Sequence, residues 1–170
     1  MTDQLPYTVV RAFPCFDVRR YPALVLVQVR IASVAPRAGL VGAGALHRYL
    51  GGDNATGAVF DVPAPLLYEV GESGPLVSLV LPTDTDPVVV PAPLDERVLI
   101  RARPAHEVAA LGFTGRFSTP RLLAHGRELL AEVRSCRLEP VGSVSYARFD
   151  QGHRPGFLCH NEALVRVIST

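Results

Sequence analysis

The sequence contains no lysine: all 17 of its basic residues are arginine, in a chain of 170 residues. Without lysine the protein cannot form a Schiff base with a carbonyl substrate, so that class of covalent catalysis is excluded. The 16 acidic residues leave a formal net charge of only +1. So small a charge argues against a surface that binds nucleic acid or another polyanion.

Cysteine is scarce, and long apolar runs are missing. Cys15, Cys136 and Cys159 cannot all pair within one chain, and none lies in a C-x-x-C motif, so we expect free thiols in a reducing compartment. The first ten residues lack the basic and apolar regions of a signal peptide. No stretch approaches the roughly 20 apolar residues that span a bilayer. We therefore expect a cytoplasmic protein that does not bind membranes.

What is present suits one folded domain. Hydrophobic residues make up 48% of the chain and charged residues 19%, which is typical of globular proteins. A chain of this length can bury a sizeable core. We therefore expect residues 1–170 to form a single domain.

Alternating apolar and polar residues predict the strands. In the clearest case Val25, Val27 and Val29 occupy one face, and Gln28 and Arg30 occupy the other. Strands are also expected at 7–13, 16–21, 75–82, 97–103, 106–117, 143–150 and 162–169.

A strand, a Pro-Arg pair and a helix occur at 23–50 and again at 107–134. Proline suits the first turn of a helix, so each pair marks a helix start. Two β-α-β-β halves, about 7–81 and 96–168, would then be joined by the proline-rich connection 82–95. This order predicts an α+β fold with two helices against an antiparallel sheet or open barrel. In the second helix we expect Leu122, Leu123, Leu129, Leu130 and Val133 on the buried side.

Enzyme signatures are weak. The segment "GAGALH" at 42–47 lies inside the first helix, whereas a dinucleotide phosphate needs the turn between a strand and a helix. Cys159 and His160 are adjacent, so in a strand they point to opposite faces, which argues against a nucleophile–base pair. His153 and His160 lack the short spacing of a zinc site. We expect no catalytic residues, and we interpret Ser118 and His125 as structural or solvated.

His47 is the most informative histidine. At 100° per residue it lies on the same helical stripe as Leu40, Ala43 and Leu50. It is either a satisfied core or boundary histidine or a histidine that faces an apolar groove. The many small residues of this helix fit either close packing on the sheet or a flat ligand lying against it.

These pieces resemble the SOUL/haem-binding protein family over roughly residues 7–168. The resemblance rests on "YTVV", "FDVRRYP", "LHRYLGGDN", "LVLP", "LGFTGRF" and "YARFDQGHRPGFLCHNEALVRV", which occur in the family's order. It implies a distorted antiparallel β-barrel flanked by two α-helices, with a pseudo-twofold relation between two similar halves. It further implies a non-catalytic protein that binds haem or another tetrapyrrole for intracellular binding, transport or buffering.

The resemblance also implies where the ligand lies. The family's groove corresponds to helix 36–50 and loop 149–160. Arg48 and Arg154 take the places of basic residues that would face the haem propionates. His47 and His153 become the first candidates for iron ligands, with His160 in reserve. The other contacts expected from these two segments are Leu40, Ala43, Phe149 and Phe157.

The sequence departs from the family at the groove. The histidine that ligates iron in some members is replaced by Arg20. Gln151-Gly152 stands where two prolines are usual, and Cys159-His160 where Arg-Arg is usual. A sensor or effector-binding module of the same fold that does not hold haem therefore remains an alternative, and a haem-modifying activity is a third. In each case we expect a monomer with a small-molecule partner and no nucleic acid.

Overall fold

The computed structural model describes residues 5–31, 38–61, 65–149, 155 and 158–168, and only the backbone of 38–42. Within these residues the chain folds into nine strands and two helices. The strand pairings described below are all antiparallel. Two compact units result: one comprises Met1–Leu5 and Ala23–Pro104, the other Pro6–Pro22 and Ala105–Thr170. The fold class is therefore α+β, as the sequence predicts.

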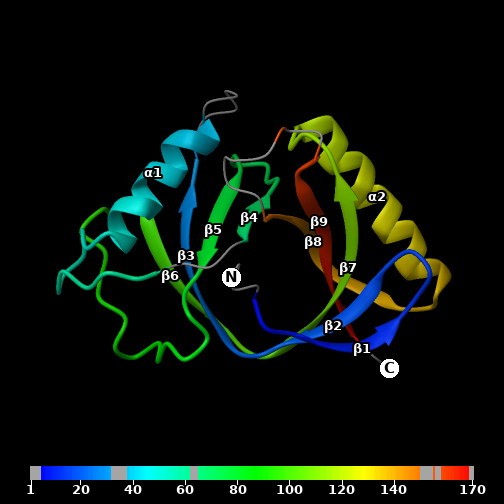
Figure 1. Ribbon diagram of the computed structural model, residues 1–170, viewed down its shortest axis with the longest axis horizontal. Helices are drawn as coiled ribbons and strands as arrows, with labels where there is room; N and C mark the ends of the chain where they lie inside the picture. The colour runs from blue at the N-terminus through cyan, green and yellow to red at the C-terminus, as the bar shows by residue number, and fades with distance from the viewer. Residues whose placement is uncertain (1–4, 32–37, 62–64, 150–154, 156–157, 169–170) are drawn as a thin grey trace. The chain divides into compact units, whose positions relative to one another are not determined.

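The first unit consists of four strands and one helix. Its strands follow the order β4-β5-β3-β6. The bounds are β3 Leu24–Arg30, α1 Ala38–Leu50, β4 Leu66–Glu69, β5 Leu76–Val80 and β6 Val98–Arg103. Figure 1 shows α1 in cyan beside the strands of its unit.

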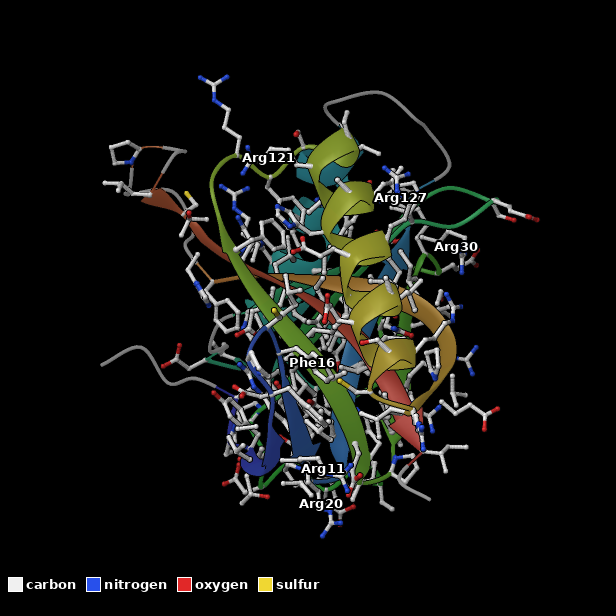
Figure 2. The ribbon with its side chains drawn as sticks, turned by 90° about the vertical axis from the view of Figure 1, so that its right-hand side faces the viewer. Arg11, Phe16, Arg20, Arg30, Arg121 and Arg127 are labelled. Carbon is white, nitrogen blue, oxygen red and sulfur yellow. The ribbon has the colours of Figure 1, made fainter. Side chains whose placement is uncertain are left out.

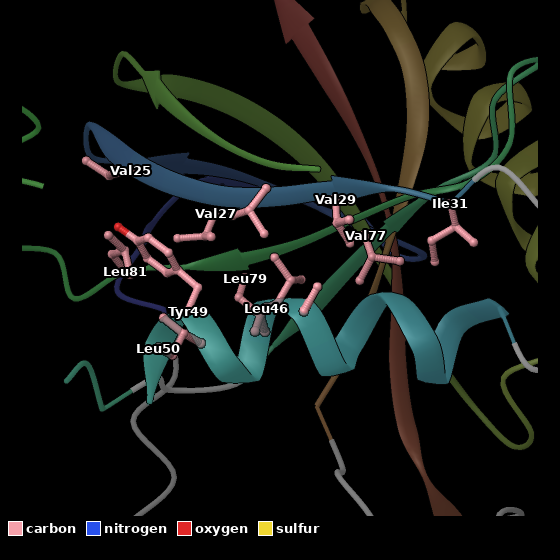
Figure 3. Close-up of a cluster of buried hydrophobic side chains, with 12 residues drawn as sticks. Val25, Val27, Val29, Ile31, Leu46, Tyr49, Leu50, Val77, Leu79 and Leu81 are labelled. Carbon is pink, nitrogen blue, oxygen red and sulfur yellow. The ribbon is translucent and has the colours of Figure 1, made fainter. Parts of the chain in front are cut away.

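The core of this unit is apolar throughout. Val27 and Val29 of β3 and Val77 of β5 are at most 3% exposed, and they pack with Leu46 and Tyr49 of α1 (Figure 3). Because strand side chains alternate, the residues between these valines lie on the face away from the helix. Burial of this cluster fixes which face of α1 is turned inward.

The second unit contains five strands and the longer helix. Its strands follow the order β1-β2-β7-β9-β8. The bounds are β1 Thr8–Ala12, β2 Asp17–Tyr21, β7 His106–Thr114, α2 Thr119–Ser135, β8 Glu139–Arg148 and β9 His160–Ile168. Figure 2 faces α2, with Arg121 and Arg127 labelled beside it.

Helix α2 lies on its sheet through Leu122, Leu129 and Val133, which are at most 1% exposed. Its start agrees with the sequence, since Pro120 occupies the first turn. Gly126 faces the sheet as well: a Cβ atom there would overlap the hydroxyl of Tyr146 on β8. The glycine therefore allows helix and strand to approach closely.

The two units share one internal order. In each, the strand before the helix is flanked on one side by the second strand after the helix, β3 by β5 and β7 by β9. On the other side β3 lies beside β6, which precedes β7 in the chain, and β7 lies beside β2, which precedes β3. The pairings form no closed ring among the described residues, so closure into a barrel stays an expectation.

Several sequence expectations need correction. Leu66–Glu69 is a strand that the sequence patterns did not locate. Strand β8 begins at Glu139, earlier than the expected 143, and its pairing shifts register between Val141 and Ser145. Leu123 of α2 is 39% exposed. Neither helix combines the length and apolar character needed to cross a membrane in the described part of the chain.

Candidate functional site

The end of α1 is built by the segment "LHRYLGGDN". The side-chain amide of Asn54 donates to the carbonyl oxygens of Tyr49 and Ala58 at 3.0 and 2.7 Å, and its Oδ1 accepts from the Ala58 N–H. The Tyr49 hydroxyl donates to the Pro91 carbonyl at 2.7 Å. Gly52 adopts a positive φ of 106°, which suits glycine. These contacts fix the last turn of α1 against the loop that follows β5.

His47 and Arg48 lie on the exposed side of that turn. The sequence left open whether His47 is a core or boundary histidine or faces a groove. Its exposure excludes the core position, because Leu46 and Tyr49 form the buried face of the helix. Ala43 is half-buried, and Nδ1 of His47 donates to its carbonyl oxygen at 2.7 Å. That bond orients the imidazole along the helix surface.

Among the described residues, the contacts of Arg48 to carboxylates are long. Its Nη2 lies 3.5 Å from Asp95 and its Nε 3.9 Å from Asp53. Asp95 is held more closely by Arg97, at 2.7 and 2.9 Å. The hydrogen bonds from the Arg97 side chain and backbone lower the pKa of Asp95 well below its usual value. Because Arg97 satisfies Asp95, the Arg48 guanidinium keeps donors for another anion.

The second unit holds a buried ion pair on the sheet face away from α2. Nη1 of Arg19 on β2 donates to both carboxylate oxygens of Glu162 on β9 at 2.9 Å. The two residues are 7% and 4% exposed. Burial disfavours the charged guanidinium, but the charge of Glu162 and the hydrogen bonds to Tyr21 and Glu162 together outweigh this and raise the pKa of Arg19. A charge pair so deeply buried marks a candidate functional site.

Aromatic and polar side chains surround this pair. The Arg19 guanidinium carbon lies 4.4 Å from the ring centroid of Tyr7, within cation–π range. Nε2 of His160 lies 3.4 Å from Oε1 of Glu162, and the rings of His160 and Phe149 are 5.2 Å apart. We call this group the Arg19–Glu162 cluster; it comprises Tyr7, Arg19, Phe149, His160 and Glu162.

The cluster contains an unsatisfied donor. Among the described residues the buried Nε of Arg19 has no hydrogen-bond partner. Burying such a group without a partner costs about 1–3 kcal/mol. The orphaned donor therefore favours a bound water or a ligand acceptor at this point.

Sequence reasoning missed Arg19, Glu162 and Tyr7 as site residues. Arg19 and Glu162 are 143 positions apart, and no periodic pattern brings them together. A signal was present nonetheless, because "FDVRRYP" contains Arg19 and the late "NE" contains Glu162. Two segments that carry the family resemblance thus meet in one ion pair.

The remaining candidates divide in two groups. His153, Arg154 and Phe157 lie outside the described residues, and the backbone alone places Leu40 in α1. Phe149 is half-buried, and the His160 side chain is 47% exposed. Cys159 is buried.

Arg20, which replaces the family's histidine, points away from the cluster. It lies on the opposite face of β2 from Arg19, is 61% exposed and contacts Glu107 at 2.5 Å. A shallow, open depression of about 440 Å³ adjoins it, lined by Arg20, Ala105, His106, Glu107, Arg166, Val167 and Ile168. The depression lies at the start of β7.

A free metal ion has no site in the described part of the chain, where no three His, Cys, Asp or Glu side chains come together suitably. A haem needs less from the protein, because its macrocycle already supplies four nitrogen ligands and leaves axial positions for imidazole. His47 and His160 are both accessible and both held by a hydrogen bond at one ring nitrogen. These residues therefore fit an iron porphyrin better than a bare ion.

Structural comparison identifies the fold among known proteins. The C-terminal domain of EcmrR superposes with a TM-score of 0.63 over 96% of this chain and 99% of that one, at 8% identity. A hydrolase from Listeria innocua gives a TM-score of 0.57 over 91% and 92%, at 11% identity. The EcmrR–DNA complex gives 0.60 over 91% of this chain and 57% of that chain, at 13% identity. At such identities the likeness shows the fold alone.

Sequence comparison is more specific. No curated protein matches the chain. The model of the family described as "SOUL heme-binding protein" matches residues 2–166, which is nearly the whole sequence. The chain belongs to the SOUL heme-binding protein family.

Proposed function

We propose that this protein binds haem or a related tetrapyrrole without catalysing a reaction on it, for intracellular binding, transport or buffering. The family match over residues 2–166 carries the proposal. As part of it, the protein acts as a cytoplasmic monomer without nucleic-acid or membrane partners, and its two β-α-β-β halves form the family's distorted barrel. Bound haem would supply an iron that could take an imidazole ligand from the protein.

Arg48 is assigned to a propionate. It is 56% exposed, and its nearest carboxylates lie 3.5 and 3.9 Å away. A ligand carboxylate at ordinary charge-assisted distance, about 2.8 Å, would be a better acceptor than either. Arg154 is assigned to the second propionate.

The remaining assignments follow the two segments. The ligand contacts assigned to α1 are Leu40, Ala43 and His47. Those assigned to the late loop include Phe149 at its start and His160 at its end. His153 and Phe157 complete the loop, with His153 as a further candidate iron ligand. Phe149 supports this assignment because its half-buried ring lies beside His160.

The test is a set of binding isotherms with haemin and with its dimethyl ester. Arg48→Ala and Arg154→Ala should each weaken haemin binding by several-fold to about thirty-fold, which corresponds to about 1–2 kcal/mol. Arg101→Ala, an exposed arginine of β6, is the matched control and should change nothing. Equal binding of ester and free acid to the wild type would show that no arginine contacts a propionate.

A second candidate is a small-molecule sensor that does not hold haem. The likeness to EcmrR, a protein also solved in complex with DNA, supports it at the level of the fold. If the Soret band of haemin stays unchanged when the protein is added, this candidate is favoured. Because one structural neighbour is a hydrolase, ester substrates should also be screened; we expect no turnover, and turnover would contradict the non-catalytic proposal.

A further inference from the structure

The loop 81–97, which joins β5 to β6 and is green in Figure 1, exposes apolar side chains to solvent. Val88 is 87% exposed, Val89 72% and Leu94 64%. Single exposed apolar residues are common on soluble proteins, whereas neighbouring ones at this exposure are typical of a surface that binds a partner. Val88 and Val89 follow one another in the chain, so the loop presents them as a pair.

Hydrogen bonds and packing hold this loop in place. The N–H groups of the two valines donate to the side chain and the carbonyl of Asp86, at 2.9 and 3.1 Å. Directly after them Val90 packs against the core of the first unit, and the Pro91 carbonyl accepts from the hydroxyl of Tyr49 at 2.7 Å. The valine pair is therefore presented by an ordered loop, and a partner that binds it loses little entropy in fixing the loop.

The loop is also the acidic part of the chain. Residues 49–96 contain eight of the 16 acidic residues and none of the 17 arginines. Asp84, Asp86 and Glu96 are exposed, and in the described part of the chain no cation forms an ion pair with any of them. Arg97, which follows them, is held by Asp95 at 2.7 Å. We call the following residues the acidic loop surface: Asp84, Asp86, Val88, Val89, Leu94 and Glu96.

We propose that the acidic loop surface binds a protein partner that presents apolar side chains within a basic segment. Burial of the valines and the leucine supplies affinity, and the unlike charges steer the encounter and disfavour acidic partners. The same carboxylates repel an anionic membrane surface. They also disfavour a twofold dimer of this chain, which would place two acidic loop surfaces against each other. This inference goes beyond the proposed function and does not depend on haem.

The first test uses a synthetic helical peptide with leucine on one face and arginine on the other, added to the protein without haem. Amide NMR shifts should be saturable and centred on residues 84–96, and added salt should weaken the binding. The same peptide with glutamate in place of arginine should not bind. Shifts centred elsewhere, an absence of saturable shifts, or equal binding of the two peptides would overturn the proposal.

Two double variants separate the apolar from the charged contribution. Val88→Ser/Val89→Ser should weaken binding of the arginine peptide by about ten-fold or more, because the exposed pair forms the apolar centre of the surface. Asp84→Asn/Glu96→Gln should weaken it several-fold and reduce its dependence on salt. All four side chains are exposed, so the circular dichroism should stay that of the wild type. Wild-type affinity in both double variants would overturn the proposal.

The matched controls change one exposed apolar and one exposed acidic residue of the second unit. Leu123→Ser in α2 and Glu139→Gln in β8 should bind the arginine peptide as the wild type does. A loss in the controls as large as in Val88→Ser/Val89→Ser would overturn the proposal, because binding would then be unspecific.

Two further measurements test other occupants of the surface. The wild type and Val88→Ser/Val89→Ser are compared for binding to vesicles of phosphatidylcholine and phosphatidylglycerol, and for self-association by sedimentation equilibrium. We expect neither vesicle binding nor self-association. Either one, present in the wild type and lost in the double variant, would assign the surface to lipid or to a second copy of the chain and overturn the proposal. Because these experiments use the protein without haem, a failure of the proposed function leaves their outcome unchanged.

Discussion

The two units have the same strand order but different chemistry on the sheet face away from the helix. In the first unit that face buries a neutral pair, Gln28 and Ser78, with Nε2 and Oγ 2.9 Å apart. In the second it buries Arg19 and Glu162. One architecture thus accommodates either a neutral or a charged pair at that face. Buried charge is costly to maintain, so the second unit is the part of the molecule where we expect chemistry.

The two helices differ in how closely they pack against their strands. At position 126 of α2 the side chain of Tyr146 leaves no room for a Cβ atom, so glycine is needed there. The nearest group to a Cβ at Gly44 of α1 is an arginine nitrogen 3.9 Å away. The second helix is fitted closely to its strands. The first tolerates change on its accessible side, the side that carries Arg48.

The largest effect should come from removing half of the charged pair. Arg19→Met leaves Glu162 buried and uncompensated, so we expect a loss of about 3–5 kcal/mol in the free energy of unfolding, measured by urea denaturation. The double variant Arg19→Met/Glu162→Leu should recover most of that loss. If the single variant is as stable as the wild type, the pair is not buried in solution.

The next effect should come from the close helix contact in the second unit. Gly126→Ala pushes a methyl group into the Tyr146 hydroxyl, and Tyr146 is only 2% exposed, so the ring has little room to move. Overpacking of this kind costs about 1–3 kcal/mol. Thermal unfolding of Gly126→Ala and of Gly126→Ala/Tyr146→Phe, which removes the hydroxyl, would show whether that atom causes the loss.

The neutral pair of the first unit should matter less. Gln28→Leu leaves the Ser78 hydroxyl buried without its partner, at a cost of about 1–2 kcal/mol. Adding Ser78→Ala should reduce that cost. A loss in Gln28→Leu as large as that in Arg19→Met would remove the distinction between the units.

The smallest change should be a gain. Gly44→Ala places a methyl group where the structure has space, and alanine is favoured over glycine within a helix by up to about 1 kcal/mol. Its midpoint in urea should rise slightly. A lower urea midpoint would mean that α1 has no room for a methyl group at Gly44.

The sequence predicted elements whose periodicity is long and regular. Alternation located β3, and helical spacing located the buried Leu122, Leu129 and Val133 of α2. It failed at β4, a four-residue strand within a stretch dominated by proline and glycine.

The site was harder to predict than the fold. Helical spacing alone left the position of His47 open, because it does not weigh Leu46 and Tyr49 by the area that they bury. The Arg19–Glu162 contact joins residues 143 apart, and only tertiary folding creates it. Sequence patterns report local spacing, whereas this site depends on which strands become neighbours in the folded chain.

The most direct test of the central claim is the amide NMR spectrum of the protein during titration with zinc protoporphyrin. Ring-current shifts from the macrocycle report which residues lie near it. We expect saturable shifts at Arg48, Phe149, His160 and Glu162, with those of Val27 and Val77 unchanged. No saturable shifts, or shifts centred on the depression at Arg20 and Arg166, would contradict the account.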